Sequence, residues 1–136
     1  MLRSVSLACA VFAVAAAAAA AEPDWNALAG EREIVVLSEN PDGSPHETTV
    51  WLAVTGAQGF IRTGNTRWYP NLERKPEISV RIAGVEYPVR AELVTDPALE
   101  KAVIDAFAAK YGWSDTMVAW FFPGHPHIVK LAPRAP

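Results

Sequence analysis

Short segments in which apolar and polar side chains alternate dominate this sequence. The clearest runs over residues 46–55, where one side of an extended chain would carry Thr48, Val50, Leu52 and Val54. The other side would carry Thr49, Trp51, Ala53 and Thr55. A repeat of two residues is the period of a β-strand, whose successive side chains point to opposite faces of the sheet. The pattern therefore predicts an antiparallel sheet with one buried face.

Further segments have the same strand character and are separated by turn-forming residues. They are 33–38, 59–63, 77–83, 85–94 and 125–131. The first is apolar on both sides and is expected to be a buried strand. The short connection at 56–59 and the glycine at 84 predict two hairpins, one on each side of residues 65–75. Pro88 has no backbone N–H, so we expect it at an edge or a bulge of the second hairpin.

One long helix is expected late in the chain. Asp96 provides a cap, Pro97 suits the first helical position, and an apolar residue then recurs every four positions until Gly112. Shorter helical pieces are expected at 24–29, where the turn would plug one end of the core, at 65–75 as a short helix or irregular turn, and at 117–122. About six strands with one main amphipathic helix predict an α+β fold, a small antiparallel β-barrel.

The N-terminus has the pattern of a secretory signal peptide. Arg3 precedes an alanine-rich apolar run over residues 5–20, and the run ends in Ala19-Ala20-Ala21 before Glu22. An early positive charge, a short apolar region and small residues before a polar start are typical of a cleaved signal. We expect cleavage after Ala21, export to the periplasm or the medium, and no stable membrane insertion afterwards. The alternative is an uncleaved anchor, because the run is nearly long enough to span a bilayer.

The remaining residues, 22–136, suit a single domain with one hydrophobic core. Cys9 is the only cysteine and lies in the expected signal, so the exported part would contain no disulfide, no thiolate nucleophile and no cysteine metal site. The formal net charge of the chain is -3. This mild acidity argues against a nucleic-acid partner, because nucleic-acid binders present basic surfaces.

Residues 60–71 combine hydrogen-bond donors and aromatic rings more densely than any other segment. A short apolar run is followed there by Arg62, Thr63, Asn65, Thr66, Arg67, Trp68, Tyr69 and Asn71. A guanidinium forms charge-assisted bonds with phosphate oxygens, and a flat side chain can lie against a flat ligand. Simpler interpretations stay open: the arginines could pair with surface carboxylates such as Glu73, Glu77 or Glu86, the two aromatic residues could belong to the core, and Asn71 could cap a turn.

Four short sequence motifs resemble those of the flavin-binding split-barrel superfamily, which includes pyridoxamine phosphate oxidases and deazaflavin-dependent nitroreductases. They are Glu47-Thr48-Thr49-Val50-Trp51-Leu52, Phe60-Ile61-Arg62-Thr63-Gly64, Arg67-Trp68-Tyr69-Pro70-Asn71-Leu72 and Ile78-Ser79-Val80-Arg81-Ile82-Ala83-Gly84. Their order and spacing are most similar to the domain of unknown function 2255 family. The resemblance implies a split β-barrel and a cofactor in a groove, either FMN or a deazaflavin.

The resemblance also implies roles for individual residues. Arg62 and Thr63 match the positions that reach the cofactor phosphate. The connecting loop would contribute Asn65, Thr66 and Arg67, the turn that closes over the site would contribute Trp68, Tyr69 and Asn71, and the strand beside the ring would contribute Thr48, Thr49 and Trp51. It further implies a homodimer and an oxidoreductase acting on a small organic acceptor, in which the cofactor performs the redox chemistry.

Other function classes are weaker on the sequence. A non-catalytic envelope module that uses the barrel to bind another ligand or a protein is the main alternative. His46, His125 and His127 raise the question of a metal, but no acidic or cysteine partner lies near them in sequence. Ser114, Asp115 and His125 are not accompanied by a nucleophile elbow, which argues against a hydrolase.

Overall fold

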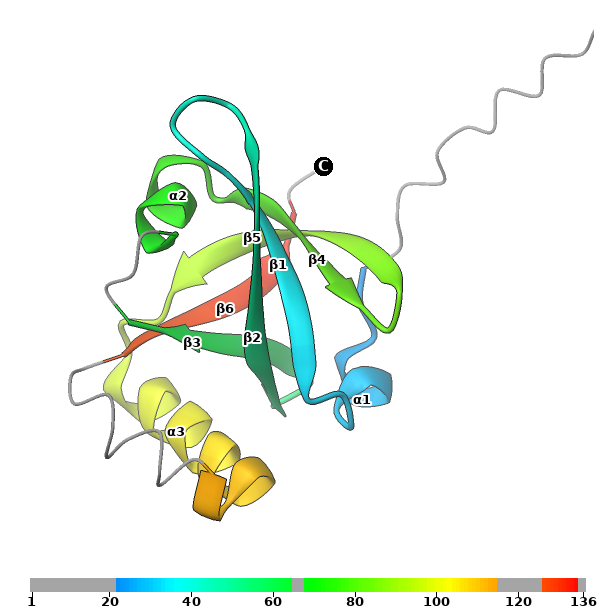
Figure 1. The fold of residues 1–136 in the computed structure, drawn as a ribbon. Helices are drawn as coiled ribbons and strands as arrows, with labels where there is room; N and C mark the ends of the chain where they lie inside the picture. Colours follow the sequence, from blue (N-terminus) through cyan, green and yellow to red (C-terminus); the bar gives the residue numbers. More distant parts are fainter. Residues whose placement is uncertain (1–21, 65–67, 115–125, 135–136) are drawn as a thin grey trace, which may run out of the picture.

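The computed structural model of the chain describes residues 22–64, 68–114 and 126–134. Its centre is a closed antiparallel barrel of six strands in the order β1-β2-β3-β6-β5-β4 (Figure 1). The strands are β1 (Glu33–Glu39), β2 (Pro45–Thr55), β3 (Gln58–Thr63), β4 (Glu77–Ile82), β5 (Val85–Leu93) and β6 (His127–Pro133). The helices are α1 (Trp25–Leu28), α2 (Tyr69–Arg74) and α3 (Pro97–Tyr111). The predicted fold class and both hairpins are confirmed.

Two-residue turns close both hairpins. Thr55 pairs with Gln58 across Gly56 and Ala57, and both turn residues have positive φ angles of 57° and 58°. In the second hairpin, Ala83 and Gly84 have φ angles of 49° and 80°. Positive φ at both turn positions matches the right-handed twist of the flanking strands.

Alternate residues of the strands fill the inside of the barrel. The interior core contains Ile34, Val36, Leu52, Ile61, Ile78, Val80, Ile82, Val89, Val129 and Leu131. Trp25 of α1 and Leu72 of α2 join this core, and the two helices lie at different ends of the barrel in Figure 1. A Cβ at position 59 would lie 2.5 Å from the Trp25 ring, so this plug requires Gly59.

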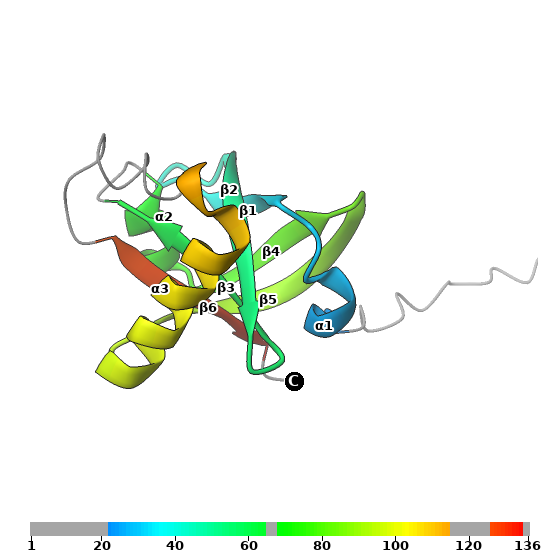
Figure 2. The same cartoon turned by 90° about the horizontal axis from the view of Figure 1, so that it is seen from below.

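A second core lies outside the barrel, beneath α3. Val103, Phe107 and Tyr111 of the helix pack on Ala53, Phe60 and Ile128 of the sheet. Figure 2 shows α3 lying across this part of the barrel. Asp96 caps the helix by accepting a hydrogen bond from the backbone N–H of Ala98 at 3.3 Å, and Gly112 ends it with a positive φ of 54°, as predicted.

Two strands differ in detail from the predicted pattern. In β1 the inward residues are buried, but Val35 and Leu37 on the outer side are only half-buried. Pro88 pairs with Ser79 of β4 and lies just before the β5–β6 ladder, which begins at Val89. Its missing N–H therefore interrupts no bond to β6, as expected for an edge position. The predicted piece at 117–122 lies outside the described residues.

No helix in the described part of the chain is long and apolar enough to cross a membrane.

Candidate functional site

The structure divides the predicted site residues between the two faces of the β2–β3 sheet. Side chains alternate along a strand, so neighbours in sequence point to opposite sides. Arg62 lies on the outer face, where its guanidinium carbon is 4.3 Å from the centroid of the Phe107 ring of α3. Thr63, the next residue, is only 6% exposed and follows the interior residue Ile61 by two positions. The two side chains therefore leave the strand on opposite faces of the sheet.

Arg62 and Trp51 are neighbours on the outer face. Leu52 of β2 pairs with Ile61 of β3, so the adjacent positions, Trp51 and Arg62, lie side by side on the two strands. The ring of Trp51 stacks on Tyr111 of α3, with 4.4 Å between centroids and 9° between planes. Thr49, two residues before Trp51 on the same face, is exposed. Two of the predicted residues, Trp51 and Arg62, are thus brought together beside α3, and Thr49 lies on the same face of β2.

The hydroxyl of Tyr111 holds the end of α3 against the barrel beside Trp51. It accepts a hydrogen bond from the backbone N–H of Leu52 at 3.1 Å, and its single hydrogen is shared between the carbonyl oxygens of Leu52 at 2.6 Å and Arg32 at 2.7 Å. Burial raises the pKa of this phenol, although the bond to Leu52 and the nearby Arg32 and Arg62 act in the other direction. The phenol therefore stays neutral and locks the Trp51 stack in place.

Cations surround the aromatic pair of α3. The guanidinium of Arg32 lies 5.1 Å and the ammonium of Lys110 5.4 Å from the centroid of the Tyr111 ring. Burial lowers the pKa of Lys110, and repulsion by Arg32 lowers it further. With Arg62 over Phe107, three cations lie at this part of the surface, and the carboxylates of Glu31 and Glu33 are near enough to act on Lys110 and Tyr111, respectively. We call Arg32, Trp51, Arg62, Phe107, Lys110 and Tyr111 the arginine–aromatic face.

The contribution of α3 to this face was missed at the sequence level. Phe107 and Tyr111 were expected only as apolar residues of the helix. Their contacts with Arg62 and Trp51 depend on how the helix docks on the barrel, and no local pattern reports that. The sequence contains one indication of this contribution. Two residues with polar groups, Lys110 and Tyr111, stand next to each other at the end of the otherwise apolar stripe of the helix.

The remaining predicted residues belong to the interior. Thr63 donates its hydroxyl hydrogen to the carbonyl oxygen of Gly64 at 3.0 Å. Trp68 and Tyr69 are 7% and 8% exposed and pack in the interior core, in agreement with the simpler interpretation. Thr48 is half-buried with an oxygen that has no hydrogen-bond partner, and Ser38 on β1 has a second such oxygen.

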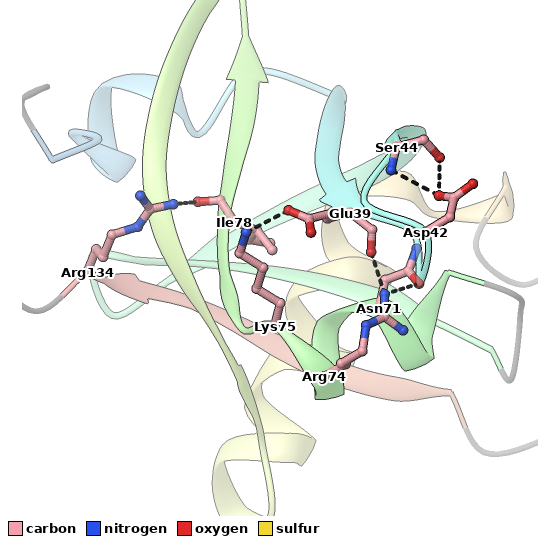
Figure 3. Close-up of polar contacts among 8 residues, drawn as sticks. All are labelled: Glu39, Asp42, Ser44, Asn71, Arg74, Lys75, Ile78 and Arg134. Atoms are coloured by element: carbon pink, nitrogen blue, oxygen red, sulfur yellow. Dashed lines mark hydrogen bonds and ion pairs between the residues drawn. The ribbon is translucent and has the colours of Figure 1, made fainter.

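Asn71 organises the contact between α2 and the loop after β1. Its side chain is 2% exposed, donates to the Asn40 amide oxygen at 3.2 Å and accepts from Arg74 at 3.0 Å. Arg74 also donates to the carbonyl oxygen of Glu39 at 2.6 Å (Figure 3). The backbone carbonyl of Asn71 accepts from Lys75 at the end of the helix. These contacts assign Asn71 a structural role, which includes the helix-terminating bond.

A small pocket opens between α2 and the strands β5 and β6. Its volume is about 140 Å³, and its lining includes Tyr69, Glu73, Leu93 and Val129. Tyr69 stacks on His127 at the start of β6, with 4.0 Å between ring centroids and 2° between planes. Burial raises the pKa of Tyr69, and the negative charge of Glu73 raises it further.

Several predictions lie outside the described residues. They concern Asn65, Thr66 and Arg67 of the expected loop, and His125 and Asp115. Among 22–64, 68–114 and 126–134, no group of three or more His, Cys, Asp or Glu side chains is placed to hold a metal ion. Glu77, one of the carboxylates considered as an arginine partner, pairs with Arg90.

The family was identified by comparison with known sequences. The profile of a family described as an uncharacterized protein conserved in bacteria, domain of unknown function 2255, matches residues 24–123. The chain belongs to this family. The match covers α1 through α3 and five of the six barrel strands, with β6 beyond it, so the arginine–aromatic face lies entirely within the domain of unknown function 2255. A comparison with curated proteins finds no match.

Solved structures share the fold at low sequence identity. The conserved hypothetical protein Rv2991 from Mycobacterium tuberculosis is 20% identical, with a TM-score of 0.64 over 87% of this chain and 84% of that one. HutZ, the heme storage protein from Vibrio cholerae, is 14% identical, with a TM-score of 0.62 over 78% and 84%. An F420-H2 dependent reductase is 10% identical, with a TM-score of 0.58 over 73% and 93%. The split-barrel resemblance is therefore confirmed at the level of the fold.

Proposed function

We propose that this protein binds a flavin-type cofactor, FMN or a deazaflavin, on the arginine–aromatic face and transfers a hydride or electrons to a small organic acceptor. The observation that carries the proposal is the placement of Arg62 beside Trp51 on the outer side of β2 and β3. Following the N-terminal pattern, we also propose that the protein acts outside the cytoplasm, and from the family resemblance that it acts as a homodimer.

The donor set of this face fits a phosphate next to a flat ring. Arg62 provides a guanidinium for charge-assisted hydrogen bonds, and the exposed hydroxyl of Thr49 provides a neutral donor. Trp51 provides an aromatic surface that Tyr111 holds in one orientation. By contrast, the inner group of Thr63, Trp68 and Asn71 is buried.

Electrostatics favour an anionic ligand here. The rings of Phe107 and Tyr111 are 5.9 Å apart, and each has a guanidinium over it. The pKa of Lys110 is lowered mainly by burial; repulsion by Arg32 lowers it further, and the carboxylate of Glu31 acts in the other direction. A bound phosphate would relieve this repulsion.

The bound cofactor would supply the redox chemistry, and the chain would supply binding and orientation. Arg62 and Thr49 would hold the phosphate end and Trp51 would position the ring. The similarity to a heme storage protein and to an F420-H2 dependent reductase supports cofactor binding on this barrel without selecting the cofactor.

Reconstitution tests the proposal. The purified protein is incubated with FMN, a deazaflavin or hemin, separated by gel filtration, and its absorbance spectrum and thermal midpoint are measured. We expect FMN or the deazaflavin to be retained and to raise the midpoint. Retention of hemin alone, or of none of the three, would refute the proposal.

A non-catalytic binding module is the second candidate. It is favoured by the interior positions of Trp68, Tyr69 and Asn71, whose burial is explained without a ligand. Cofactor-dependent turnover that disappears in Arg62→Gln, with folding preserved, would exclude this candidate. Arg81→Gln is the matched control, because Arg81 is a half-exposed arginine on β4 that pairs with Glu47 at 2.7 Å.

A further inference from the structure

The pocket between α2 and the β5–β6 sheet is separate from the arginine–aromatic face. Its lining includes Val129, which also belongs to the interior core of the barrel. Apolar side chains form most of its lining, namely Leu72, Pro76, Ala91, Leu93 and Val129. Tyr69 and Glu73 of α2 are the two polar members.

The size of the pocket restricts its ligand to a single ring. Its volume of about 140 Å³ is close to the roughly 150 Å³ of an engineered apolar cavity that binds benzene. It is well below the roughly 300 Å³ at which pockets for larger ligands begin. The tricyclic ring of a flavin therefore does not fit, whereas one six-membered ring does.

The charge of the pocket selects the substituent. Among the described residues, Glu73 is the only charged one in the lining, and it is exposed on α2. Within the described part of the chain it makes no hydrogen bond or ion pair. Its negative charge is felt inside the pocket, since it contributes to the raised pKa of Tyr69 after the larger effect of burial. A cation there gains both the carboxylate and the face of the phenol ring.

The rigidity of the wall supports recognition of a flat ligand. Tyr69 is held by its stack on His127, and Leu93 at the rim is 50% exposed. Leu93 therefore forms an apolar rim at the entrance of the pocket, and a small bound ligand can cover this side chain. We propose that this pocket binds a small aromatic amine, with the ring against the neighbouring side chains of Leu93 and Val129 and the ammonium group at Glu73.

Three probes of similar shape separate the contribution of the ring from the contribution of the charge. Benzylamine, benzyl alcohol and benzoate share a ring and differ in charge, and their binding to the full chain is measured by isothermal titration or by NMR line shifts. We expect benzylamine to bind about 5-fold more tightly than benzyl alcohol. Benzoate is expected not to bind, because Glu73 repels it. Equal affinity for all three, or no binding of benzylamine, would overturn the proposal.

Two variants assign the site. Glu73→Gln should reduce benzylamine affinity to that of benzyl alcohol, and Leu93→Arg should abolish benzylamine binding by placing a second cation at the rim. Both residues are exposed, so folding is preserved, which circular dichroism verifies. Glu86→Gln is the control, because Glu86 is an exposed acid of β5 outside the pocket. Unchanged binding in both site variants would overturn the assignment.

Discussion

The phenol ring of Tyr69 lies parallel to the imidazole of His127, with 4.0 Å between centroids and 2° between planes. This stack joins the first turn of α2 to the first residue of β6, two elements far apart in sequence. It therefore fixes the wall shared by the interior core and the small pocket.

Replacing His127 with leucine should weaken this contact between α2 and β6. The substitution replaces the imidazole by an apolar side chain of similar size and removes the aromatic pair, which contributes about 1 kcal/mol beyond its buried area. We expect the free energy of unfolding in urea to fall by about that amount. His46→Leu, on β2, is the control, and an equal loss in both variants would contradict a specific role for the stack.

The hydroxyl of Tyr111 is predicted to stabilise the contact between α3 and the barrel. Tyr111→Phe removes its bonds to the backbone of Leu52 and Arg32 and keeps the ring. We expect the free energy of unfolding to fall by about 0.5–1.5 kcal/mol, the net worth of an ordinary hydrogen bond, because the backbone groups of Leu52 and Arg32 keep other partners. Tyr87→Phe, at a half-buried position of β5, should cost less.

Alkaline pH should destabilise the protein through the same phenol. The folded-state pKa of Tyr111 is raised above the ordinary value of 10.0 by burial. The unfolded chain therefore loses its proton first, and stability present below pH 10.0 is lost as the pH rises toward the folded pKa. Urea melts between pH 9 and 11 should show a smaller decline for Tyr111→Phe than for the wild type. Parallel declines would refute this origin.

Two hydroxyl groups inside the barrel are predicted to be destabilising. The oxygens of Ser38 and Thr48 are buried without hydrogen-bond partners, and a buried unsatisfied polar group costs about 1–3 kcal/mol. We expect Thr48→Val and Ser38→Ala to raise the unfolding free energy. Thr63→Val should not, because its hydroxyl bonds to Gly64. A loss of stability in the first two variants would instead indicate a buried water bound to these groups.

The sequence was informative where structure follows from local periodicity. The alternation in 46–55 correctly separated Thr48 from Thr49, and the four-residue repeat together with Asp96 and Gly112 defined α3. Both hairpins were visible because their turns use local chemistry. The same alternation also separates Arg62 from Thr63, which the family resemblance had placed at one phosphate.

Other features depend on contacts between distant residues, so no local pattern reports them. Asn71 is buried because Asn40, 31 positions earlier, completes its hydrogen bonds. Tyr111 reaches the carbonyl of Arg32 across 79 positions, and this contact is what brings α3 to Trp51. The sequence could therefore separate neighbouring strand residues onto two faces, but it could not indicate that α3 lies beside Trp51 and Arg62.

The affinity for FMN relative to riboflavin tests the proposed site most directly. Riboflavin lacks the phosphate, and a charge-assisted hydrogen bond from Arg62 is worth about 1.5–3 kcal/mol. We predict that the protein binds FMN about 10- to 100-fold more tightly than riboflavin, as measured by flavin fluorescence. We further predict that Arg62→Gln removes the difference while Arg81→Gln retains it. Equal binding of FMN and riboflavin by the wild type, or an unchanged ratio in Arg62→Gln, would contradict the assignment of the arginine–aromatic face as a flavin phosphate site.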